Sequence, residues 1–238
     1  MKIIRFAMFV IFGWASLIFF TPIVIVSSIF GHRVAFRVVK FWALLVLLLI
    51  KYFCGLTFRV KGKENISDKA CIIYMKHSSA YETLVQLVLF PMQCWVLKRE
   101  LMWLPFFGWA AAALKPIAIN RKGGRIAVNQ IINQGIRRLS KGISIIIFPE
   151  GTRMPFNKTK RYGISGALLA QKARVKILPI AHNAGAYWPK QRNWITPGVV
   201  TFIIGKPVVA EGRDAQELNL EIQTWIQDKI IKTEESKI

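Results

Sequence analysis

His77 and Glu82 stand five positions apart in the segment His-Ser-Ser-Ala-Tyr-Glu, and together they could form a general base and its orienting carboxylate. Inside one helix, five steps of about 100° would put the two side chains about 140° apart, on different faces. The pair therefore works only if His77 precedes a helix and Glu82 lies in its first turn. Glu82 then accepts a hydrogen bond from one ring nitrogen, and the other nitrogen can take a proton from an attacking hydroxyl, a role worth roughly 10²–10⁴-fold in rate.

The same segment also has a structural explanation. Ser79 and Glu82 have the spacing of a capping box, in which the carboxylate reaches back to the backbone of the serine. On these residues alone, the cap is the more common arrangement. Ser78 and Ser79 lack the Gly-x-Ser-x-Gly surroundings of a nucleophile elbow, which disfavours a serine nucleophile.

A second cluster, Phe-Pro-Glu-Gly-Thr-Arg at 148–153, leaves an apolar run and could cradle a phosphate. Gly151 permits close approach of the backbone to a ligand. Arg153 offers a planar fork that suits phosphate and that lysine would not reproduce. Arg121, which follows another apolar run, could supply a second fork. Glu150 beside these arginines could instead form a structural ion pair.

Two further segments are weaker signals. Lys98 could help neutralise a phosphate, although a single lysine at the end of a strand is more often a solvated charge. Leu178-Pro179-Ile180 could wall an acyl pocket, but alone it is an ordinary strand and turn. Neither segment identifies a site by itself.

Taken in order, these segments resemble the four sequence blocks of the glycerolipid acyltransferases. The blocks are the His-x4-acidic segment, the run from Lys98-x-Glu-Leu through Pro-x-x-Gly to Ile-Asn-Arg121, the loop at 148–153, and Leu-Pro-Ile. The resemblance covers roughly residues 55 to 210, and bacterial 1-acyl-glycerol-3-phosphate acyltransferases are most similar in size and layout. Glu82 and Asn120 stand where Asp is more usual, and Met154 where Ser is more usual.

This resemblance implies an enzyme that acylates lysophosphatidate to phosphatidate, with acyl-CoA or acyl-carrier protein as donor, no cofactor and no acyl-enzyme. It implies that His77 activates the free hydroxyl and that Glu82 orients His77. The residues implied to hold the glycerol phosphate are Lys98, Arg121, Glu150, Gly151, Thr152 and Arg153, and those implied to wall the acyl pocket are Leu178, Pro179 and Ile180. The nearest alternative is an acyltransferase that acts on another lysophospholipid or lysolipid.

Residues of this kind need a scaffold that brings them together. Past residue 56, short apolar runs alternate with longer amphipathic stretches, which predicts an α/β fold with a mixed sheet flanked by helices. The run 143–148 is nearly continuous in apolar residues, as in a central strand buried on both faces. Predicted strands are 57–60, 70–75, 94–98, 116–119, 143–148, 176–180 and 199–204, and predicted helices are 79–90, 123–139, 163–173 and 215–231.

The beginning of the chain predicts an apolar two-helix membrane motif. No charged residue occurs from Phe6 to Gly31, and about 20 apolar residues suffice to cross a bilayer core. Pro22 would kink this helix or turn the chain in the membrane. A second apolar run, 41–50, is too short to span alone and could lie in the interface or pair with the first run as a re-entrant hairpin.

We therefore expect membrane-anchoring helices in residues 1–54 and a catalytic domain in 55–238. The alternative is a buried helical hairpin of a soluble protein. Three basic residues follow the first apolar run, at Arg33, Arg37 and Lys40, and they favour a cytoplasmic catalytic domain if that run spans. With the bacterial resemblance, this predicts the cytoplasmic face of a bacterial inner membrane.

The composition of the chain narrows the classes of partner that it could bind. The chain holds 34 Lys and Arg against 12 Asp and Glu, a formal charge of +22, together with 53% hydrophobic residues. Basic and apolar character together favour a membrane surface over nucleic acid. A non-catalytic basic protein that binds anionic lipid or nucleic acid remains an alternative, but it gives no reason for four ordered blocks. Three cysteines and three histidines show no metal-ligand spacing, so we predict no metal site; the oligomeric state is left open.

Overall fold

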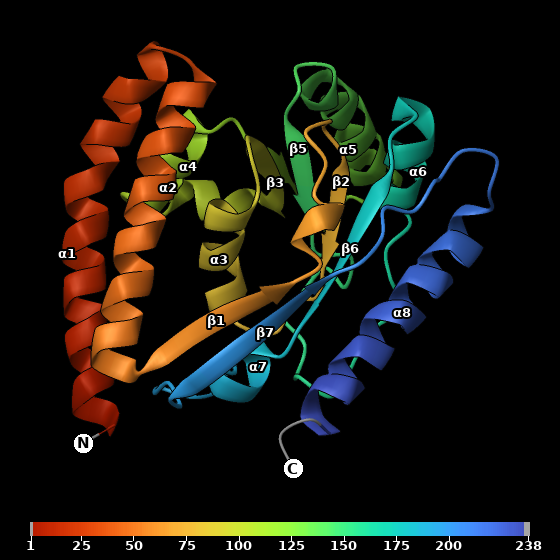
Figure 1. The fold of residues 1–238 in the computed structure, drawn as a ribbon. Helices are drawn as coiled ribbons and strands as arrows, with labels where there is room; N and C mark the ends of the chain where they lie inside the picture. Colours follow the sequence, from red (N-terminus) through yellow and green to blue (C-terminus); the bar gives the residue numbers. More distant parts are fainter. Residues whose placement is uncertain (1, 236–238) are drawn as a thin grey trace.

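A seven-stranded mixed sheet forms the centre of the computed structural model, which describes residues 2–235 of the chain and side chains as far as Ile231 (Figure 1). Its strand order is β1-β7-β6-β2-β5-β3-β4, and every neighbouring pair is parallel except β6 with β7. The strands are β1 (Leu56–Lys61), β2 (Ile72–Met75), β3 (Gln93–Lys98), β4 (Ile117–Ile119), β5 (Ser144–Ile147), β6 (Ile177–His182) and β7 (Gly198–Ile204). Each lies within two residues of a predicted strand at both ends, and the predicted mixed sheet is confirmed.

The predicted central strand is β5. All four of its residues are buried, and it pairs in parallel with β2 on one side and β3 on the other. Its neighbour β2 is buried along its whole length as well. Strands covered on both faces cannot alternate apolar with polar residues, which explains the continuous apolar run in the sequence.

Helices cover both faces of the sheet (Figure 1). On one face, α5 (Gly124–Leu139), α6 (Ser165–Ala173) and α8 (Ala215–Glu235) share a core with the sheet. On the other, α3 (Tyr81–Leu89) and α7 (Ala184–Tyr187) pack against it with the end of the N-terminal hairpin. Four short elements of the sheet domain were not predicted: the 3₁₀ turn η2 (Lys63–Asn65), the 3₁₀ helix η3 (Arg99–Trp103), α4 (Phe107–Ala113) and α7.

The N-terminal apolar segment forms a helical hairpin. Helix α1 (Lys2–Ile29) lies beside α2 (His32–Leu49), which continues as one π-helical turn, η1 (Ile50–Cys54). The suggestion that the chain turns at Pro22 is wrong, because α1 runs through that residue. The turn falls at Gly31 instead, where φ is 103°, a conformation that glycine adopts without strain.

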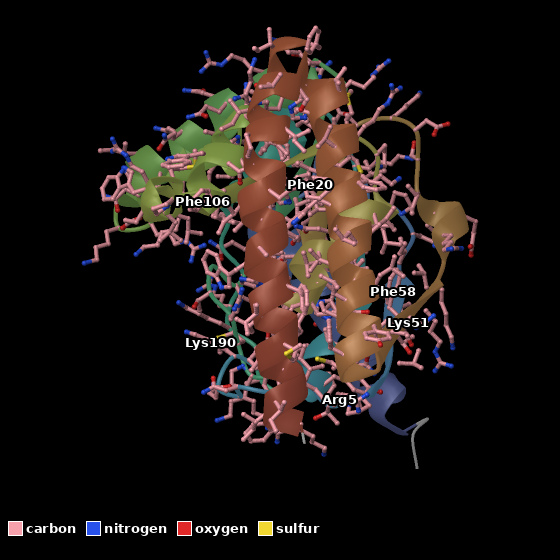
Figure 2. The ribbon with its side chains drawn as sticks, turned by 90° about the vertical axis from the view of Figure 1, so that its left-hand side faces the viewer. Arg5, Phe20, Lys51, Phe58, Phe106 and Lys190 are labelled. Carbon is pink, nitrogen blue, oxygen red and sulfur yellow. The ribbon has the colours of Figure 1, made fainter. Side chains whose placement is uncertain are left out.

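The hairpin packs along the sheet domain at both of its ends. Near the N-terminus, the Phe9 ring lies edge-on to Trp188, with centroids 5.8 Å apart. Towards the turn, Thr21 Oγ1 lies 3.3 Å from the carbonyl oxygen of Phe106 and donates a hydrogen bond to it. The outer face of α1 is apolar and exposed, as the view towards that face shows (Figure 2). Among residues 2–235, α1 is the one helix long and apolar enough to cross a membrane. The division into 1–54 and 55–238 stays a prediction, and residues 236–238 lie outside the described part.

Candidate active site

The ends of three strands deliver the predicted site residues to one edge of the sheet. His77 comes two residues after β2, Arg121 two residues after β4, and Glu150 three residues after β5. Because these strands run parallel through the sheet, their carboxyl ends meet at the same edge, where open α/β sheets bind ligands. Segments that lie far apart in the sequence thus converge.

His77 and Glu82 have the geometry that their spacing requires. His77 precedes α3, Glu82 lies in its first turn, and His77 Nδ1 is 2.9 Å from Glu82 Oε1. The Glu82 side chain is fully buried, whereas the His77 side chain keeps 14% of its surface exposed. An ionised carboxylate can only accept, so Nδ1 carries the proton and donates, and Nε2 is left as an acceptor. This tautomer is the one a general base needs.

Glu82 also caps the helix, so both explanations of the segment hold together. Its Oε1 accepts hydrogen bonds from the backbone N–H groups of Ser78, at 3.1 Å, and Ser79, at 3.0 Å. Burial alone would raise the pKa of Glu82. The hydrogen bond from His77, the nearby imidazoles and the Ser79 N–H outweigh burial and lower that pKa below its ordinary value. The carboxylate is therefore ionised at neutral pH.

The His77 ring is held from other sides as well. Phe148 stacks on it with ring centroids 4.1 Å apart and an interplanar angle of 26°. Met154 directly follows the loop at 148–153, and its backbone N–H donates to the carbonyl oxygen of His77 at 2.8 Å. The loop at 148–153 and the base are thus fixed to each other directly.

Glu150 has a different place from the one predicted for it. Its side chain is fully buried; Oε1 accepts from Lys76 Nζ at 2.9 Å and from Thr159 Oγ1 at 3.1 Å, and Oε2 accepts from the backbone N–H of His77 at 3.1 Å. With both oxygens occupied by protein donors, Glu150 does not face a ligand, and a carboxylate would repel a phosphate. It forms an ion pair, with Lys76 rather than with an arginine, and it positions His77.

Lys76 was missed in the sequence. It is 2% exposed, and its ammonium group also donates to the carbonyl oxygen of Lys158 at 2.7 Å. A lysine that directly follows a fully apolar strand is a signal for a buried ion pair, because such a charge is rarely buried without a partner. His182 was also missed in the sequence. It is 1% exposed and its Nε2 donates to the carbonyl oxygen of Lys76 at 2.8 Å.

The two arginines come together at the loop that follows β5. Arg121 donates through Nη1 to the carbonyl oxygen of Gly151, and Gly151 has a φ of 69° in a turn closed by its N–H to Phe148. Within residues 2–235, Arg153 has no hydrogen-bond or ion-pair partner, so its guanidinium fork is available. Thr152 is exposed beside it.

The remaining predicted residues lie elsewhere. Lys98 is exposed and pairs with Glu100 at 3.2 Å, which matches the solvated strand-end charge that the sequence left open. Leu178, Pro179 and Ile180 are buried inside β6, where they pair with Ile73, Tyr74 and Met75 of β2. They belong to the core of the sheet, where both faces of β6 are covered, and they do not line the cavity described next.

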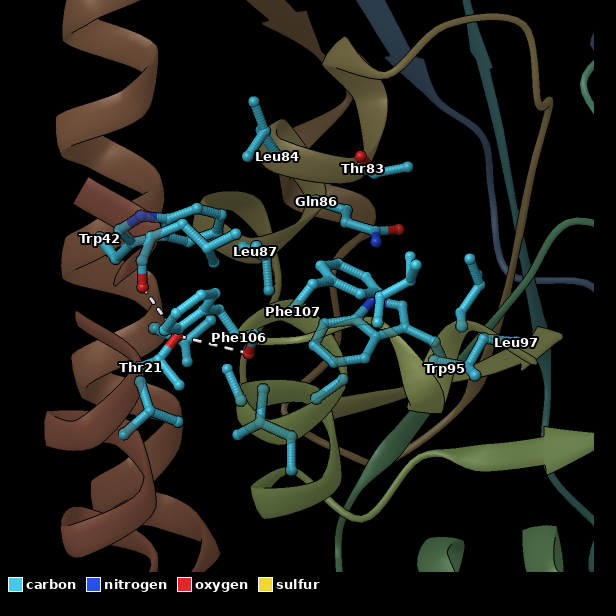
Figure 3. A pocket seen from close by; sticks show the side chains of 18 of the residues that line it. Thr21, Trp42, Thr83, Leu84, Gln86, Leu87, Trp95, Leu97, Phe106 and Phe107 are labelled. Carbon is cyan, nitrogen blue, oxygen red and sulfur yellow. Dashed lines mark hydrogen bonds between the residues drawn. The ribbon is translucent and has the colours of Figure 1, made fainter. Parts of the chain in front are cut away.

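A cavity of about 720 Å³ opens beside the base, and we call it the apolar cavity. His77, Phe148, Arg121 and Arg153 line its polar part. Its apolar walls come from the hairpin, α3, β3 and the segment from η3 to α4. Figure 3 shows Thr21 and Trp42 of the hairpin on one side, Trp95 and Leu97 of β3 on the other, and Leu87 of α3 between them. Sequence reasoning missed this lining, since no local pattern links these elements.

Comparisons with known proteins identify the family of this chain. A family model described as Acyltransferase matches residues 57–183, a range that holds His77, Glu82, both arginines and the loop at 148–153. The chain is 41% identical over 221 residues to the 1-acyl-sn-glycerol-3-phosphate acyltransferase of Pseudomonas aeruginosa, covering 91% of this chain and 84% of the relative. It is 26% identical to the human 1-acyl-sn-glycerol-3-phosphate acyltransferase beta, covering 73% of this chain and 64% of that protein.

A solved structure shares the whole architecture. The 1-acyl-sn-glycerophosphate acyltransferase of Thermotoga maritima superimposes with a TM-score of 0.82 and covers 98% of this chain and 96% of its own, at 22% identity. This likeness confirms the predicted α/β fold, a mixed sheet flanked by helices. The family resemblance read from the four sequence blocks is confirmed by the family model and by the Pseudomonas relative.

Proposed function

The chain belongs to the acyltransferase family, and we propose that it transfers a fatty acyl group from an acyl thioester to the free hydroxyl of 1-acyl-glycerol 3-phosphate, giving phosphatidate. One observation carries the proposal: a single cavity joins an oriented histidine, two arginines and extensive apolar walls. A lysophosphatidate acyltransferase needs these three things together, as base, phosphate site and acyl-chain site.

The arginines suit a phosphomonoester. Arg153 offers a guanidinium fork without a partner in the described residues, and Arg121 lies across the same loop. A phosphate held by both would place the glycerol hydroxyls beside His77 Nε2. Because the base and the loop are tied by the hydrogen bond between Met154 and His77, binding energy at the phosphate is converted into orientation of the hydroxyl.

The chemical step needs only groups already in place. His77 Nε2 takes the proton of the hydroxyl while its oxygen attacks the thioester carbonyl carbon. The tetrahedral intermediate collapses as the carbon–sulfur bond breaks, and the thiolate leaves with the proton from His77. Glu82 stays ionised throughout and stabilises the imidazolium that forms between the two proton transfers.

The apolar cavity suits the acyl chain of the donor. A donor thioester arrives from water, and each methylene group that it buries contributes roughly 0.8 kcal/mol. The chain of the lysolipid acceptor is already in a bilayer and gains little from a protein pocket. Either acyl-CoA or acyl-carrier protein could present such a thioester.

Membrane attachment is part of the proposal, with the hairpin lying along the interface rather than crossing the bilayer. Helix α1 contacts the sheet domain near both ends, through Phe9 and Thr21, so a spanning α1 would draw that domain into the hydrocarbon. Its exposed face carries large apolar side chains, among them Ile11 and Phe19. Trp103 of η3 and Trp109 of α4 are exposed as well, and tryptophan favours the membrane interface.

The basic residues fit the same orientation. Lys2 and Arg5 lie at one end of the hairpin and Arg33 and Arg37 near its turn, so a hairpin inserted turn-first would bury two arginines at about 2.5–3.5 kcal/mol each. Lying in the plane, it lets both ends reach anionic head groups. We place this surface on the cytoplasmic leaflet of a bacterial inner membrane, where acyl thioesters are made.

The test is an assay of detergent-extracted protein with lysophosphatidate and an acyl thioester, comparing wild type with His77→Ala and Arg153→Gln. We expect phosphatidate from wild type, no detectable turnover from His77→Ala, and a raised KM for lysophosphatidate in Arg153→Gln. Lysophosphatidylcholine serves as the acceptor control, because its capped phosphate should bind the arginines poorly. Wild-type rates in a folded His77→Ala protein would contradict the mechanism, and preference for the capped acceptor would contradict the substrate.

A further inference from the structure

A second, smaller cavity opens at the carboxyl ends of β3 and β4. It has a volume of about 260 Å³, and we call it the η3 cavity. Its lining consists of Arg99, Glu100, Trp103 and Asn120. All four residues are exposed, so a ligand that arrives from solution can reach their side chains. The proposed reaction leaves this cavity without a role.

The η3 cavity and the apolar cavity are neighbours, because the same two segments line both. In η3, Leu101 lines the apolar cavity, whereas Trp103 lines the η3 cavity. In the segment after β4, Arg121 lines the apolar cavity and Asn120, the residue before it, lines the η3 cavity. A ligand that fills the η3 cavity therefore lies next to the proposed catalytic site.

The η3 cavity presents hydrogen-bond donors without partners. Within the side chains that the structure describes, the Arg99 guanidinium and the Trp103 indole N–H have no hydrogen-bond or ion-pair partner. Asn120 Oδ1 accepts from the backbone N–H of Lys122 at 3.0 Å, which leaves the Nδ2 amide group of Asn120 free to donate. A set of free donors suits a ligand that is rich in acceptor atoms.

The charge around the η3 cavity favours a phosphate among such ligands. Glu100 is the acidic residue of the lining, and Lys98 Nζ neutralises it from 3.2 Å. Arg99 keeps its charge free, and its planar fork suits phosphate oxygens. Lys122, next to Asn120 in the chain, adds a further exposed positive charge.

The size and walls of the η3 cavity fit a nucleotide rather than a phosphate group alone. A volume of about 260 Å³ leaves room beside a phosphate. Trp103, which is 72% exposed, offers a flat indole on which a base can stack. The free Nδ2 of Asn120 can donate to a ring nitrogen of a purine. Arg99 can bind the phosphate of the same molecule.

The position of the η3 cavity relative to His77 fits coenzyme A. Lys98 pairs with Ile119, so Arg99 and Asn120 leave neighbouring strands at the same level. Strands lie about 4.8 Å apart, which puts the ends of β3 and β4 roughly 10 Å and 14 Å from the end of β2, just before His77. The pantetheine arm between the thioester and the pyrophosphate of coenzyme A is about as long as four to five extended residues, roughly 13–18 Å.

We propose that the η3 cavity binds the adenosine 3′-phosphate end of coenzyme A, with the pantetheine arm leading to His77 and the acyl chain in the apolar cavity. This inference rests on the proposed function, because it assumes that the thioester reacts at His77. It favours acyl-CoA over acyl-carrier protein as donor, since the prosthetic arm of the carrier has no base to stack on Trp103. The nucleotide then lies on the water side of the membrane interface, where a soluble donor arrives.

The experiment compares kcat/KM for an acyl-CoA with kcat/KM for the acyl-pantetheine of the same chain, which has the same thioester but no nucleotide. We expect Arg99→Gln and Trp103→Leu each to lower the ratio of the two values about 5-fold to 20-fold, a modest loss because the cavity is open to water. A ratio is insensitive to how much of each variant folds and to how well it binds the membrane.

The matched control is Arg137→Gln. Arg137 is an exposed arginine in the last turn of α5, a helix whose first turn follows the Asn120 segment, so the control removes the same charge at the opposite end of that helix. Its ratio should equal that of wild type.

Binding gives a second readout that needs no turnover. Adenosine 3′,5′-bisphosphate, titrated by calorimetry into detergent-extracted protein, should bind wild type and Arg137→Gln alike and Arg99→Gln about 5-fold to 20-fold more weakly. If the protein acylates no acceptor, the proposed function fails while this titration still tests the nucleotide site. Acylation by wild type together with no binding of the bisphosphate would overturn the nucleotide site alone.

Other results would assign the η3 cavity differently and overturn the proposal. If Arg99→Gln lowers kcat/KM equally for acyl-CoA and acyl-pantetheine, Arg99 supports the structure of the site and does not contact the nucleotide. If the loss occurs with acyl-carrier protein and not with acyl-CoA, the cavity serves the carrier. If the ratio stays at the wild-type value while Arg99→Gln sediments less with anionic vesicles, the arginine binds lipid head groups.

Discussion

At the scale of single residues, the site depends on carboxylates that each do two things. Glu82 orients the imidazole of His77 and caps the backbone that carries it, through three hydrogen bonds to one oxygen atom. Glu150 neutralises Lys76 and holds the N–H of His77. His77, the proposed base, is thus fixed at its ring and at its backbone by two buried anions, one in α3 and one in the loop after β5. Such fixation is what allows a histidine to act without reorganising during the reaction.

The Lys76–Glu150 pair predicts a specific pattern of stability. Lys76→Met should lower the free energy of unfolding by about 3–5 kcal/mol, because it leaves the Glu150 carboxylate buried without its cation. Adding Glu150→Gln to that variant should restore much of the loss, since a neutral amide can still accept from the His77 N–H. Denaturant unfolding of the single and double variants in detergent gives the comparison. A double variant less stable than Lys76→Met alone would refute the role assigned to the pair.

His182 predicts how stability depends on pH. Burial lowers its pKa below the ordinary value of about 6.5, although the Glu82 charge and the hydrogen bond to Lys76 oppose this. Below about pH 6.5 the unfolded chain binds a proton at this residue that the folded protein does not, so stability is full above that pH and is lost as the pH falls towards the lowered pKa. Glu82, whose pKa is also lowered, contributes a loss only at more acidic pH.

The measurement is thermal unfolding of wild type and His182→Gln between pH 7.5 and 5.5. Gln keeps an N–H that can donate to the Lys76 carbonyl but does not titrate, so the variant should lose less stability than wild type over that interval. Parallel loss in both proteins would show that His182 does not titrate there.

At the scale of elements, the sequence predicted the strands and helices that have a clear local pattern of apolar residues. Apolar runs of four to six residues become strands because both faces of the sheet are covered, and β5 follows directly from its unbroken apolar run. The segment from Arg99 to Ala113 was missed because Pro105 and Gly108 interrupt any helical period. Gly108 approaches the Met102 backbone so closely that a Cβ would lie 2.2 Å from the Met102 carbonyl oxygen. No local sequence pattern predicts this contact.

The residues of the candidate site likewise fall into those that local spacing predicts and those that depend on contacts between distant segments. His77, Glu82 and Arg153 stand in short segments whose spacing carries their geometry. Lys76 and the lining of the apolar cavity depend on contacts between elements distant in the chain, as with Trp42 and Trp95, and those contacts exist only once the hairpin packs on α3 and β3.

Close packing between α6 and the sheet gives a prediction at this scale. Gly166 of α6 faces the buried ring of Tyr74 on β2, and a Cβ there would lie 2.4 Å from the phenol oxygen. We expect Gly166→Ala to destabilise the protein by about 1–3 kcal/mol through overpacking. Gly163→Ala is the control, because its Cβ would meet only the Pro149 carbonyl oxygen at 3.6 Å. Denaturant midpoints measure the difference; equal midpoints would mean that Tyr74 can move aside.

At the scale of the whole molecule, charge and apolar surface act together. In the proposed attachment, the net charge of +22 draws the protein to anionic lipid, and the exposed face of α1 supplies an apolar contact that persists when salt screens the charge. The apolar cavity is walled in part by the same hairpin, so the surface proposed to meet the membrane is continuous with the candidate site. On this proposal, an acceptor that resides in the bilayer would reach His77 without passing through water.

This arrangement predicts which exposed apolar residues matter for membrane binding. Phe19 on α1 is 66% exposed and Leu220 on α8, at the opposite side of the molecule, is 65% exposed. Burying a Phe side chain contributes roughly 1.5–3 kcal/mol, so Phe19→Asp should weaken partitioning into anionic vesicles about 10-fold to 100-fold. Leu220→Asp introduces the same charge and should change partitioning far less, because α8 faces away from the bilayer.

Sedimentation with vesicles of phosphatidylglycerol and phosphatidylcholine, at low and high salt, separates the contribution of charge from that of apolar contact. Salt should weaken binding of wild type and both variants alike, whereas the gap between Phe19→Asp and Leu220→Asp should persist at high salt. If both substitutions weaken binding equally, attachment depends on net charge alone and the hairpin face is not the membrane-binding surface.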